Sequence, residues 1–217
     1  VEGMKEERGH SHEDEEEESH DEEEHFLHSA EETEEEHNEH VHTMDEHVWT
    51  SPGNAIDIVE HITEELCSLD PEHGQAYKDN AEAYEAQLKE LDTEFRDVVE
   101  NAKNHTLLFG DRFPFRYFAA EYGLDYYAAF SGCASDTEPS AATMAFLINK
   151  VKEEQIPVVL KMELSNDNIA NAIAEACDVP VKVFYSSHNI SAKQFEAGVT
   201  YLDLMKENVE MLKEALR

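Results

Sequence analysis

The stretch HTLLFGDRFPFRYFAAEYGLDYYAAF, residues 105–130, has the pattern of a strand, a helix and a second strand. HTLLF (105–109) and DYYAAF (125–130) are short apolar runs bounded by polar residues, which is typical of buried strands. The segment between them, to about Tyr122, favours a helix. Two strands joined by a helical crossover run parallel, because antiparallel neighbours are joined by short turns. This unit therefore predicts an α/β fold.

The same alternation continues toward the C-terminus. Strands are predicted at IPVVLKM (156–162) and VPVKVFY (179–185), and helices at about 138–154, at about 166–176, and over a final segment that turns Leu202, Met205, Val209 and Leu212 inward. Four strand–helix units predict a four-stranded parallel sheet with helices on both faces. Residues 105–217 are expected to form this α/β lobe.

Two helices are expected before the sheet. The first spans about 52–67, and Asp70 followed by Pro71 has the pattern of a helix start. An apolar stripe then runs from Tyr77 to Ala102 at spacings of three and four, which predicts one helix over about 71–103, longer than any other in the chain. A coiled coil would give a similar stripe, but a helix laid along its own domain is the simpler interpretation. Residues 47–104 are therefore expected to be a helical linker.

Charge divides the chain unevenly. The net charge is −35 over 217 residues, and residues 1–46 hold 21 acidic and two basic side chains, a net charge of −19. So acidic a chain repels nucleic acid and attracts cations, which argues against a nucleic-acid partner. With few apolar side chains to bury, residues 1–46 are expected to be disordered. Eight histidines lie in this segment: His10, His12, His20, His25, His28, His37, His40 and His42.

The predicted sheet suggests where a ligand would bind. In open parallel sheets, ligands bind beyond the carboxyl ends of the strands. Asp111, Glu163 and His188 follow the first, third and fourth predicted strands, so they are expected along one edge. Each has a plainer alternative: Asp111 could cap the next helix, Glu163 could be a solvated carboxylate or a hydrogen-bond acceptor, and His188 could be an ordinary loop histidine. His61, His73 and His105 are most simply surface residues.

Several motifs resemble one protein family, the metal-binding solute receptors of bacterial zinc and manganese ABC transporters (the cluster A-I receptors). The matching segments, in order, are DEHVWTSP (45–52), LDPEHGQAYKDNAEAYEAQL (69–88), PFRYFAAEYGL (114–124) and DTEPSAATMAFL (136–147). The first is similar to the family's D-P-H-x-W-x-D-P, the third to F-x-Y-F-A-x-x-Y-G-L, and the fourth to its E-P-S segment. Together these segments cover most of residues 40–217 in the family's order.

The resemblance implies two lobes, joined by a long helix, that close on one metal ion. His47 matches the ligand of the family's H-x-W segment. Ungapped alignment places Arg112 at the next ligand position, but a cation cannot bind a metal, and one inserted residue places Asp111 there. The last family ligand is an acidic residue near Ser186, for which His188 is expected to substitute. His47, Asp111 and His188 thus form the predicted metal site, and Glu163 is the alternative ligand. Imidazole with carboxylate suits zinc and, with more oxygen, manganese.

The function implied is extracytoplasmic capture of a divalent metal, most simply Zn²⁺ with Mn²⁺ as the alternative, and its delivery to an ABC permease by a monomeric, non-enzymatic receptor. The resemblance also implies an N-terminal lobe and an export signal upstream of Val1. The eight histidines of residues 1–46 are expected to form a weak zinc trap, or else the segment is an acidic spacer.

Two other functional classes remain open from the sequence. One is a zinc-dependent hydrolase with Glu163 as general base, although the chain has no H-E-x-x-H segment. The other is an acidic metal-buffering protein. Tight binding of a single ion with no open coordination position would favour the receptor.

Overall fold

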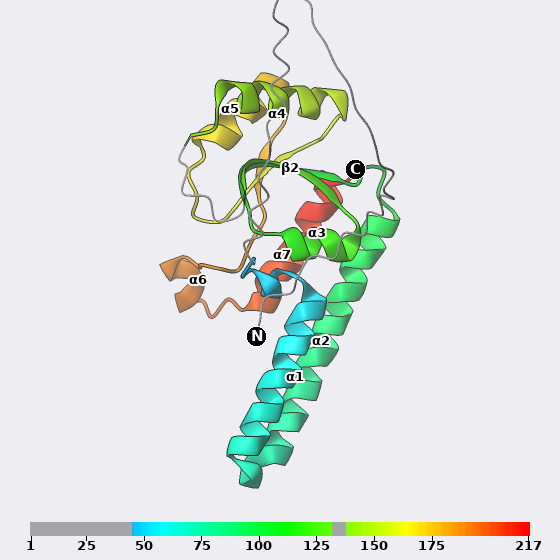
Figure 1. The fold of residues 1–217 in the computed structure, drawn as a ribbon, viewed down its shortest axis with the longest axis vertical. Coiled ribbons are helices and arrows are strands. Elements are labelled where there is room, and N and C mark those ends of the chain that lie inside the picture. Colours follow the sequence, from blue (N-terminus) through cyan, green and yellow to red (C-terminus); the bar gives the residue numbers. More distant parts are fainter. Residues whose placement is uncertain (1–44, 132–137) are drawn as a thin grey trace, which may run out of the picture.

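The centre of the molecule is a four-stranded sheet in the order β2-β1-β3-β4 with every neighbouring pair parallel, seen in a computed structural model that describes residues 45–131 and 138–217 (Figure 1). The strands are β1 (Thr106–Phe113), β2 (Asp125–Ser131), β3 (Val159–Lys161) and β4 (Val181–Val183). The predicted parallel α/β sheet is therefore confirmed. Of the segment predicted to be disordered, residues 1–46, all residues up to Met44 lie outside the described part of the chain.

The helices of the described chain are α1 (Pro52–Leu69), α2 (Gly74–Glu100), α3 (Arg116–Tyr122), α4 (Ala141–Glu153), α5 (Asn168–Cys177), α6 (Ala192–Glu196) and α7 (Tyr201–Ala215), with short 3₁₀ turns η1 (Val48–Thr50) and η2 (Pro71–His73). Five of them, α2, α3, α4, α5 and α7, pack on the two faces of the sheet. Alternate residues of β1 point to opposite faces. Leu107 and Phe109 pack in one core with α2, α3 and α7, and Leu108 packs in the other with α4 and α5. Burial on both faces explains why β1 is apolar without alternation.

The strand bounds differ from those predicted. β1 continues past Phe109 to Phe113, with a shift in its pairing with β2 between Phe109 and Arg112. A Cβ added at Gly110 would lie 2.5 Å from the Cα of Ala170, so glycine allows α5 to approach the strand at this point. β3 and β4 are shorter than predicted, because hydrogen-bond pairing covers only the middle of each apolar run.

The predicted long helix is present as α2, whose 27 residues make it the longest helix of the described chain. It begins at Gly74, after η2. Asp70 does not cap this start with its side chain; its Oδ2 instead accepts hydrogen bonds from the Tyr77 hydroxyl at 2.8 Å and the His73 ring at 2.9 Å. Pro71 stands at the first position of η2, as the sequence predicted for a helix start.

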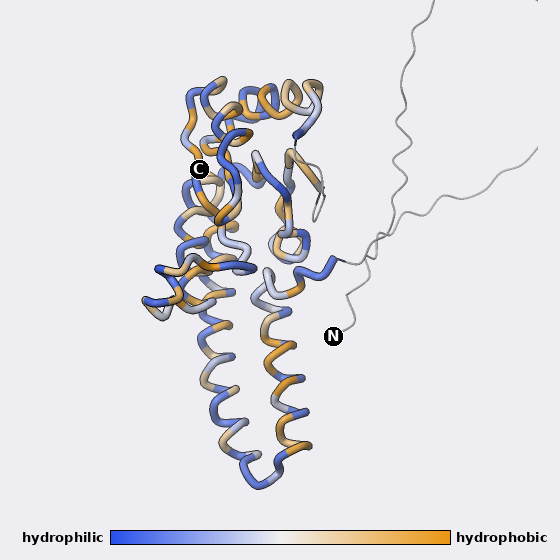
Figure 2. Tube along the Cα trace, turned by 90° about the vertical axis from the view of Figure 1, so that its left-hand side faces the viewer, coloured by the Kyte–Doolittle hydropathy of each residue, from blue (hydrophilic) through white to orange (hydrophobic). Residues whose placement is uncertain are grey.

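α1 and α2 lie side by side as a hairpin that projects from the sheet (Figure 1). Hydrophobic residues run along α1 to its far end (Figure 2). Ile62, near the middle of the helix, is 54% exposed, and Leu69, its last residue, is 80% exposed. A groove of about 280 Å³ between the two helices is lined by Val59, Ile62, Thr63, Leu66, Tyr77, Asn80, Ala81 and Tyr84. Among the helices of the described residues, none is long and apolar enough to cross a membrane.

Candidate metal centre

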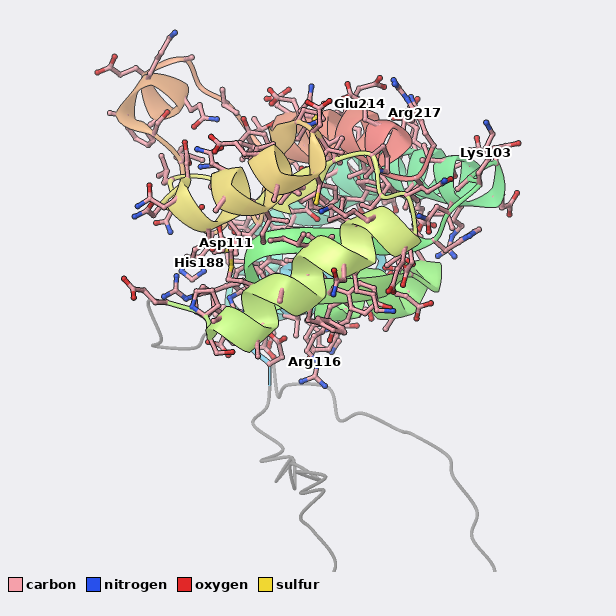
Figure 3. All side chains as sticks on the ribbon, turned by 90° about the horizontal axis from the view of Figure 1, so that it is seen from above. Lys103, Asp111, Arg116, His188, Glu214 and Arg217 are labelled. Carbon is pink, nitrogen blue, oxygen red and sulfur yellow. The ribbon has the colours of Figure 1, made fainter. Side chains whose placement is uncertain are left out.

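Asp111, Glu163 and His188 lie along one edge of the domain, at the carboxyl ends of the strands. Asp111 Oδ2 accepts a hydrogen bond from the backbone N–H of Met162 at 3.0 Å, and Glu163 Oε1 accepts one from the N–H of His188 at 3.2 Å. In Figure 3, Asp111 and His188 are labelled on the same side of the molecule, opposite Lys103. The shared edge predicted for these three residues is confirmed.

His47 lies immediately before η1 and is 3% exposed. Its backbone N–H donates to Asp45 Oδ1 at 2.9 Å, and its Nδ1 lies 2.8 Å from the same oxygen. An ionised carboxylate only accepts hydrogen bonds, so Nδ1 carries a proton, and in the neutral ring the lone pair is on Nε2. A carboxylate behind an imidazole orients the ring and makes it a stronger metal ligand.

The Asp45 carboxyl is adapted to this role. Burial tends to raise its pKa, but the hydrogen bonds from the His47 ring and backbone, with the charges of His47 and Arg116, together hold the pKa below its ordinary value. Asp45 is therefore ionised at neutral pH, as a partner for the His47 N–H must be.

The rings of His47 and His188 meet although they come from opposite ends of the described chain. Their centroids are 5.7 Å apart at an interplanar angle of 48°, and Trp49 packs against both, at 5.4 Å from His47 and 5.9 Å from His188. A tetrahedral zinc ion with Zn–N bonds of about 2.0–2.1 Å holds two imidazole centroids about 5 Å apart. The separation of the two rings is therefore compatible with a shared ion.

Hydrogen bonds from distant elements hold the His47 segment against the α/β lobe. The Trp49 indole N–H donates to the carbonyl of Ser186 at 3.0 Å, and the Tyr201 hydroxyl donates to the carbonyl of Trp49 at 2.8 Å. The Tyr117 hydroxyl donates to the carbonyl of Asp45 at 2.8 Å. These contacts join the segment to α3, to α7 and to the loop that carries His188.

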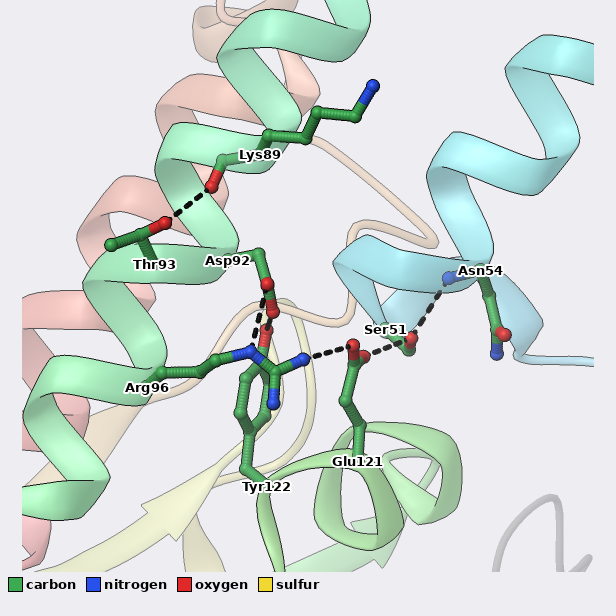
Figure 4. Close-up of polar contacts among 8 residues, drawn as sticks. All are labelled: Ser51, Asn54, Lys89, Asp92, Thr93, Arg96, Glu121 and Tyr122. Atoms are coloured by element: carbon green, nitrogen blue, oxygen red, sulfur yellow. Dashed lines mark hydrogen bonds and ion pairs between the residues drawn. The ribbon is translucent and has the colours of Figure 1, made fainter.

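A second network anchors the start of α1 just after this segment (Figure 4). The Ser51 hydroxyl accepts a hydrogen bond from the Asn54 N–H at 3.1 Å, which caps the helix, and donates to Glu121 Oε2 on α3. Arg96 on α2 donates to the other Glu121 oxygen at 3.1 Å and to Asp92 Oδ2 at 2.9 Å. Glu121 thus links α1, α2 and α3 next to the candidate ligand His47.

Asp111 has a bracing role in the structure. It is 5% exposed, and its Oδ1 accepts from the backbone N–H of Arg112 at 2.8 Å, in addition to the bond from Met162. The N-cap position of α3 is Phe115, so Asp111 does not cap that helix. Its carboxylate instead supports the irregular end of β1 and ties it to the end of β3.

The donor atoms of the predicted ligands do not form one tight cluster. Within residues 45–131 and 138–217, the one group of three or more candidate ligands with all ligand atoms within 4.8 Å of one another is Asp45, Glu46 and His47. Asp111 and His188 lie outside it. The close convergence of His47, Asp111 and His188 is thus not present in these side-chain positions, and a ligand role for Asp111 stays a prediction.

The remaining histidines of the described chain are surface residues, as predicted: His61, His73 and His105 are all exposed. Two contributors were not identified from the sequence, Asp45 and the indole of Trp49. Asp45 falls within residues 1–46, which are expected from composition to be disordered, although an acid two residues before a candidate ligand is a usable signal. The Trp49 indole gave no signal, because its partner Ser186 lies far along the chain.

A family model described as "ZnuA: Zinc-uptake complex component A periplasmic" matches residues 1–215. The chain is 32% identical over 175 residues to the high-affinity zinc uptake system protein ZnuA of Bacillus subtilis, which covers 81% of this chain and 54% of that protein. It is 33% identical over 186 residues to the zinc-binding lipoprotein AdcA of Streptococcus pneumoniae, covering 85% of this chain and 37% of that protein. The chain thus spans about half the length, or less, of these curated relatives.

Solved structures agree with these matches. The metal-dependent lipoprotein YcdH of Bacillus subtilis superposes with a TM-score of 0.71 at 32% identity, over 80% of this chain and 65% of that one. The Zn(II)-bound ZnuA-like domain of Streptococcus pneumoniae AdcA gives a TM-score of 0.68 at 32% identity, over 80% and 64%. The chain therefore belongs to the family of the periplasmic zinc-uptake complex component A, ZnuA.

Proposed function

We propose that this chain is the zinc-binding part of an extracytoplasmic solute receptor that captures Zn²⁺ and delivers it to an ABC permease. The observation that carries the proposal is the meeting of His47 and His188 at the carboxyl edge of the parallel sheet, with their rings 5.7 Å apart. The relatives' names, a zinc uptake protein and a zinc-binding lipoprotein, support zinc as cargo and a location outside the cytoplasm.

Two imidazoles favour zinc over manganese, because Mn²⁺ binds better to carboxylate, carbonyl and water oxygens. Asp45 supports His47 as a ligand by orienting its ring through the 2.8 Å contact. Asp111 is retained as a third proposed ligand, and Glu163 acts beside the site rather than as its alternative. The ion is cargo, and the receptor works as a monomer without performing chemistry on it.

The test is zinc titration of the whole chain in the presence of a competing chelator, which keeps free zinc too low to fill weak sites. His47→Ala and His188→Ala should each weaken binding by at least about tenfold, since each removes an imidazole ligand. His61→Ala is the matched control, because this exposed imidazole on α1 contacts the backbone carbonyl of Asp57, and it should leave affinity unchanged. Asp111→Asn distinguishes the two roles of Asp111. It should weaken zinc binding if the carboxylate is a ligand, and leave the affinity unchanged if the carboxylate only braces the end of β1.

Acidification gives an independent readout. Imidazole must be deprotonated to bind a metal, and free imidazoles titrate near pH 6.5, so zinc affinity should fall steeply below about pH 6. Unchanged affinity in both His47→Ala and His188→Ala would place the metal elsewhere and remove the proposal's support. Tighter binding of Mn²⁺ than of Zn²⁺ would reverse the choice of cargo.

A further inference from the structure

The turn that carries His188 is held by one carboxylate. Glu163 Oε2 accepts from the backbone N–H of Ser186 at 2.8 Å, and its Oε1 accepts from the Ser186 hydroxyl at 2.7 Å. Oε1 also accepts from the N–H groups of His188 at 3.2 Å and Asn189 at 3.4 Å. Three backbone donors and one hydroxyl therefore converge on the Glu163 carboxylate.

The same turn is in a conformation that it would not adopt readily without support. Ser187 has φ +57°, in the left-handed region that residues other than glycine rarely occupy. Its hydroxyl is the one buried side-chain N or O atom of the described residues that has no hydrogen-bond partner. Both features cost free energy, so the turn needs compensating contacts, and the four bonds to Glu163 supply them.

The turn is also tied to the other histidine. Ser186, whose N–H and hydroxyl bind Glu163, accepts the indole hydrogen bond from Trp49 through its carbonyl. Trp49 packs against the rings of both His47 and His188. A chain of contacts thus runs from Glu163 through Ser186 and Trp49 to the second imidazole.

We propose that Glu163 is a positioning residue that fixes the 186–189 turn and thereby aims the His188 imidazole at the ion shared with His47. The inference rests on the proposed function, because it assigns Glu163 a part in cargo binding. It differs from a ligand role: the Glu163 oxygens are directed at three backbone N–H groups and the Ser186 hydroxyl, and the carboxylate acts on the metal through the turn that carries His188.

The test is a double-mutant cycle on zinc affinity with Glu163→Gln, His188→Ala and the combined variant. Glutamine keeps the size of the side chain, but its NH₂ group would face one of the donors that the carboxylate accepts. Glu163→Gln alone should weaken zinc binding by about tenfold, the lower end of the effect of losing an orienting partner. In the His188→Ala background it should have a much smaller effect, because the imidazole on the turn that it fixes is gone.

Two controls separate positioning from general destabilisation. Val151→Ala, in the α4 core on the far side of β1, should lower the unfolding midpoint without changing zinc affinity. Glu153→Gln, an exposed acid on α4, should change neither. Co²⁺ loaded at saturation adds a readout of geometry: Glu163→Gln should alter its d–d absorption, whereas the controls should not.

The metal-free protein supplies a second measurement. The amide resonances of Ser186 and His188 should shift in Glu163→Gln and exchange faster with solvent, because their acceptor is lost. Unchanged zinc affinity in Glu163→Gln would overturn the inference. An equal loss of affinity in the presence and absence of His188 would overturn it too, and would make Glu163 a ligand. A wild-type chain without tight zinc binding would instead overturn the proposed function, whatever Glu163 does to the turn.

Discussion

At the scale of the residue, Ser187 carries a backbone strain that can be measured directly. Its φ of +57° suits glycine, and its buried hydroxyl has no partner among the described residues. Ser187→Gly removes both penalties. We expect the free energy of unfolding to rise by about 0.5–1 kcal/mol, less the entropy that glycine adds to the unfolded chain. Urea unfolding of the metal-free protein measures the change.

The control substitution should change the free energy of unfolding in the opposite direction. Ala83→Gly, at an exposed position inside α2, should lower the free energy of unfolding by about 0.5–1 kcal/mol, because glycine is a poor helix former. If Ser187→Gly also destabilises the protein, the left-handed serine is not a site of strain.

Residue types reveal candidate ligands in the sequence, but they do not reveal hydrogen-bond partners. His47 and His188 could be proposed because a family motif and a strand end marked them, and the structure brings their rings together. The bracing role of Asp111 could not be predicted, because its partner Met162 belongs to another strand. The hydrogen bond from the Trp49 indole to the Ser186 carbonyl could not be predicted for the same reason.

At the scale of the element, α7 begins with a capping box that should make its stability depend on pH. The Asp203 carboxylate accepts from the Thr200 N–H at 2.8 Å and hydroxyl at 2.7 Å, and the Thr200 hydroxyl accepts from the Asp203 N–H at 3.2 Å. The hydrogen bonds from the Thr200 hydroxyl and then its N–H lower the pKa of Asp203 below its ordinary value. A carboxyl with a lowered folded pKa stabilises the protein above its unfolded pKa and loses that contribution as the pH falls.

Asp203→Ala should therefore lower the urea midpoint at pH 6, and the difference from wild type should shrink as the pH falls below about 4, through the folded pKa. Glu210→Ala serves as the control on the same helix, because its carboxylate forms a surface pair with Lys213 and such pairs contribute little. A difference for Asp203→Ala that is the same at pH 6 and pH 3 would show that the carboxylate charge does not support the cap.

Hydrophobic periodicity was sufficient to predict most elements but not their ends. The stripe of α2 fixed a long helix because one face of it is buried, with Leu88, Leu91 and Phe95 fully enclosed. The end of β1 was missed because Gly110 and Asp111 have the pattern of a turn, whereas the strand passes through them with a shifted register. The five-residue helix α6 was not predicted, since it carries too few apolar residues to show a period.

At the scale of the whole molecule, the topology explains why a site forms from distant segments. The order β2-β1-β3-β4 places the carboxyl ends of β1, β3 and β4 side by side. The segment before α1 returns to this edge and is held there by Trp49 and Ser51. The edge could be predicted from the alternation of strands and helices. The return of His47 to it could not, because it depends on hydrogen bonds to residues far along the chain.

The acidic, His-rich segment 1–44 is proposed to raise the zinc concentration around the whole folded part of the chain. It contains eight histidines and 19 acidic side chains, and it lies outside the described residues. Removing it should lower the number of weakly bound zinc ions while leaving the affinity of the tight site and the urea midpoint unchanged, because His47 and His188 remain. Zinc titration with and without a competing chelator separates the two classes of site.

Replacing the eight histidines by asparagine in the full chain keeps the negative charge and should remove most of the weak sites if imidazoles hold the metal. A deletion that abolished tight binding would show instead that the segment is part of the site, and unchanged weak binding in the asparagine variant would assign the trap to its carboxylates.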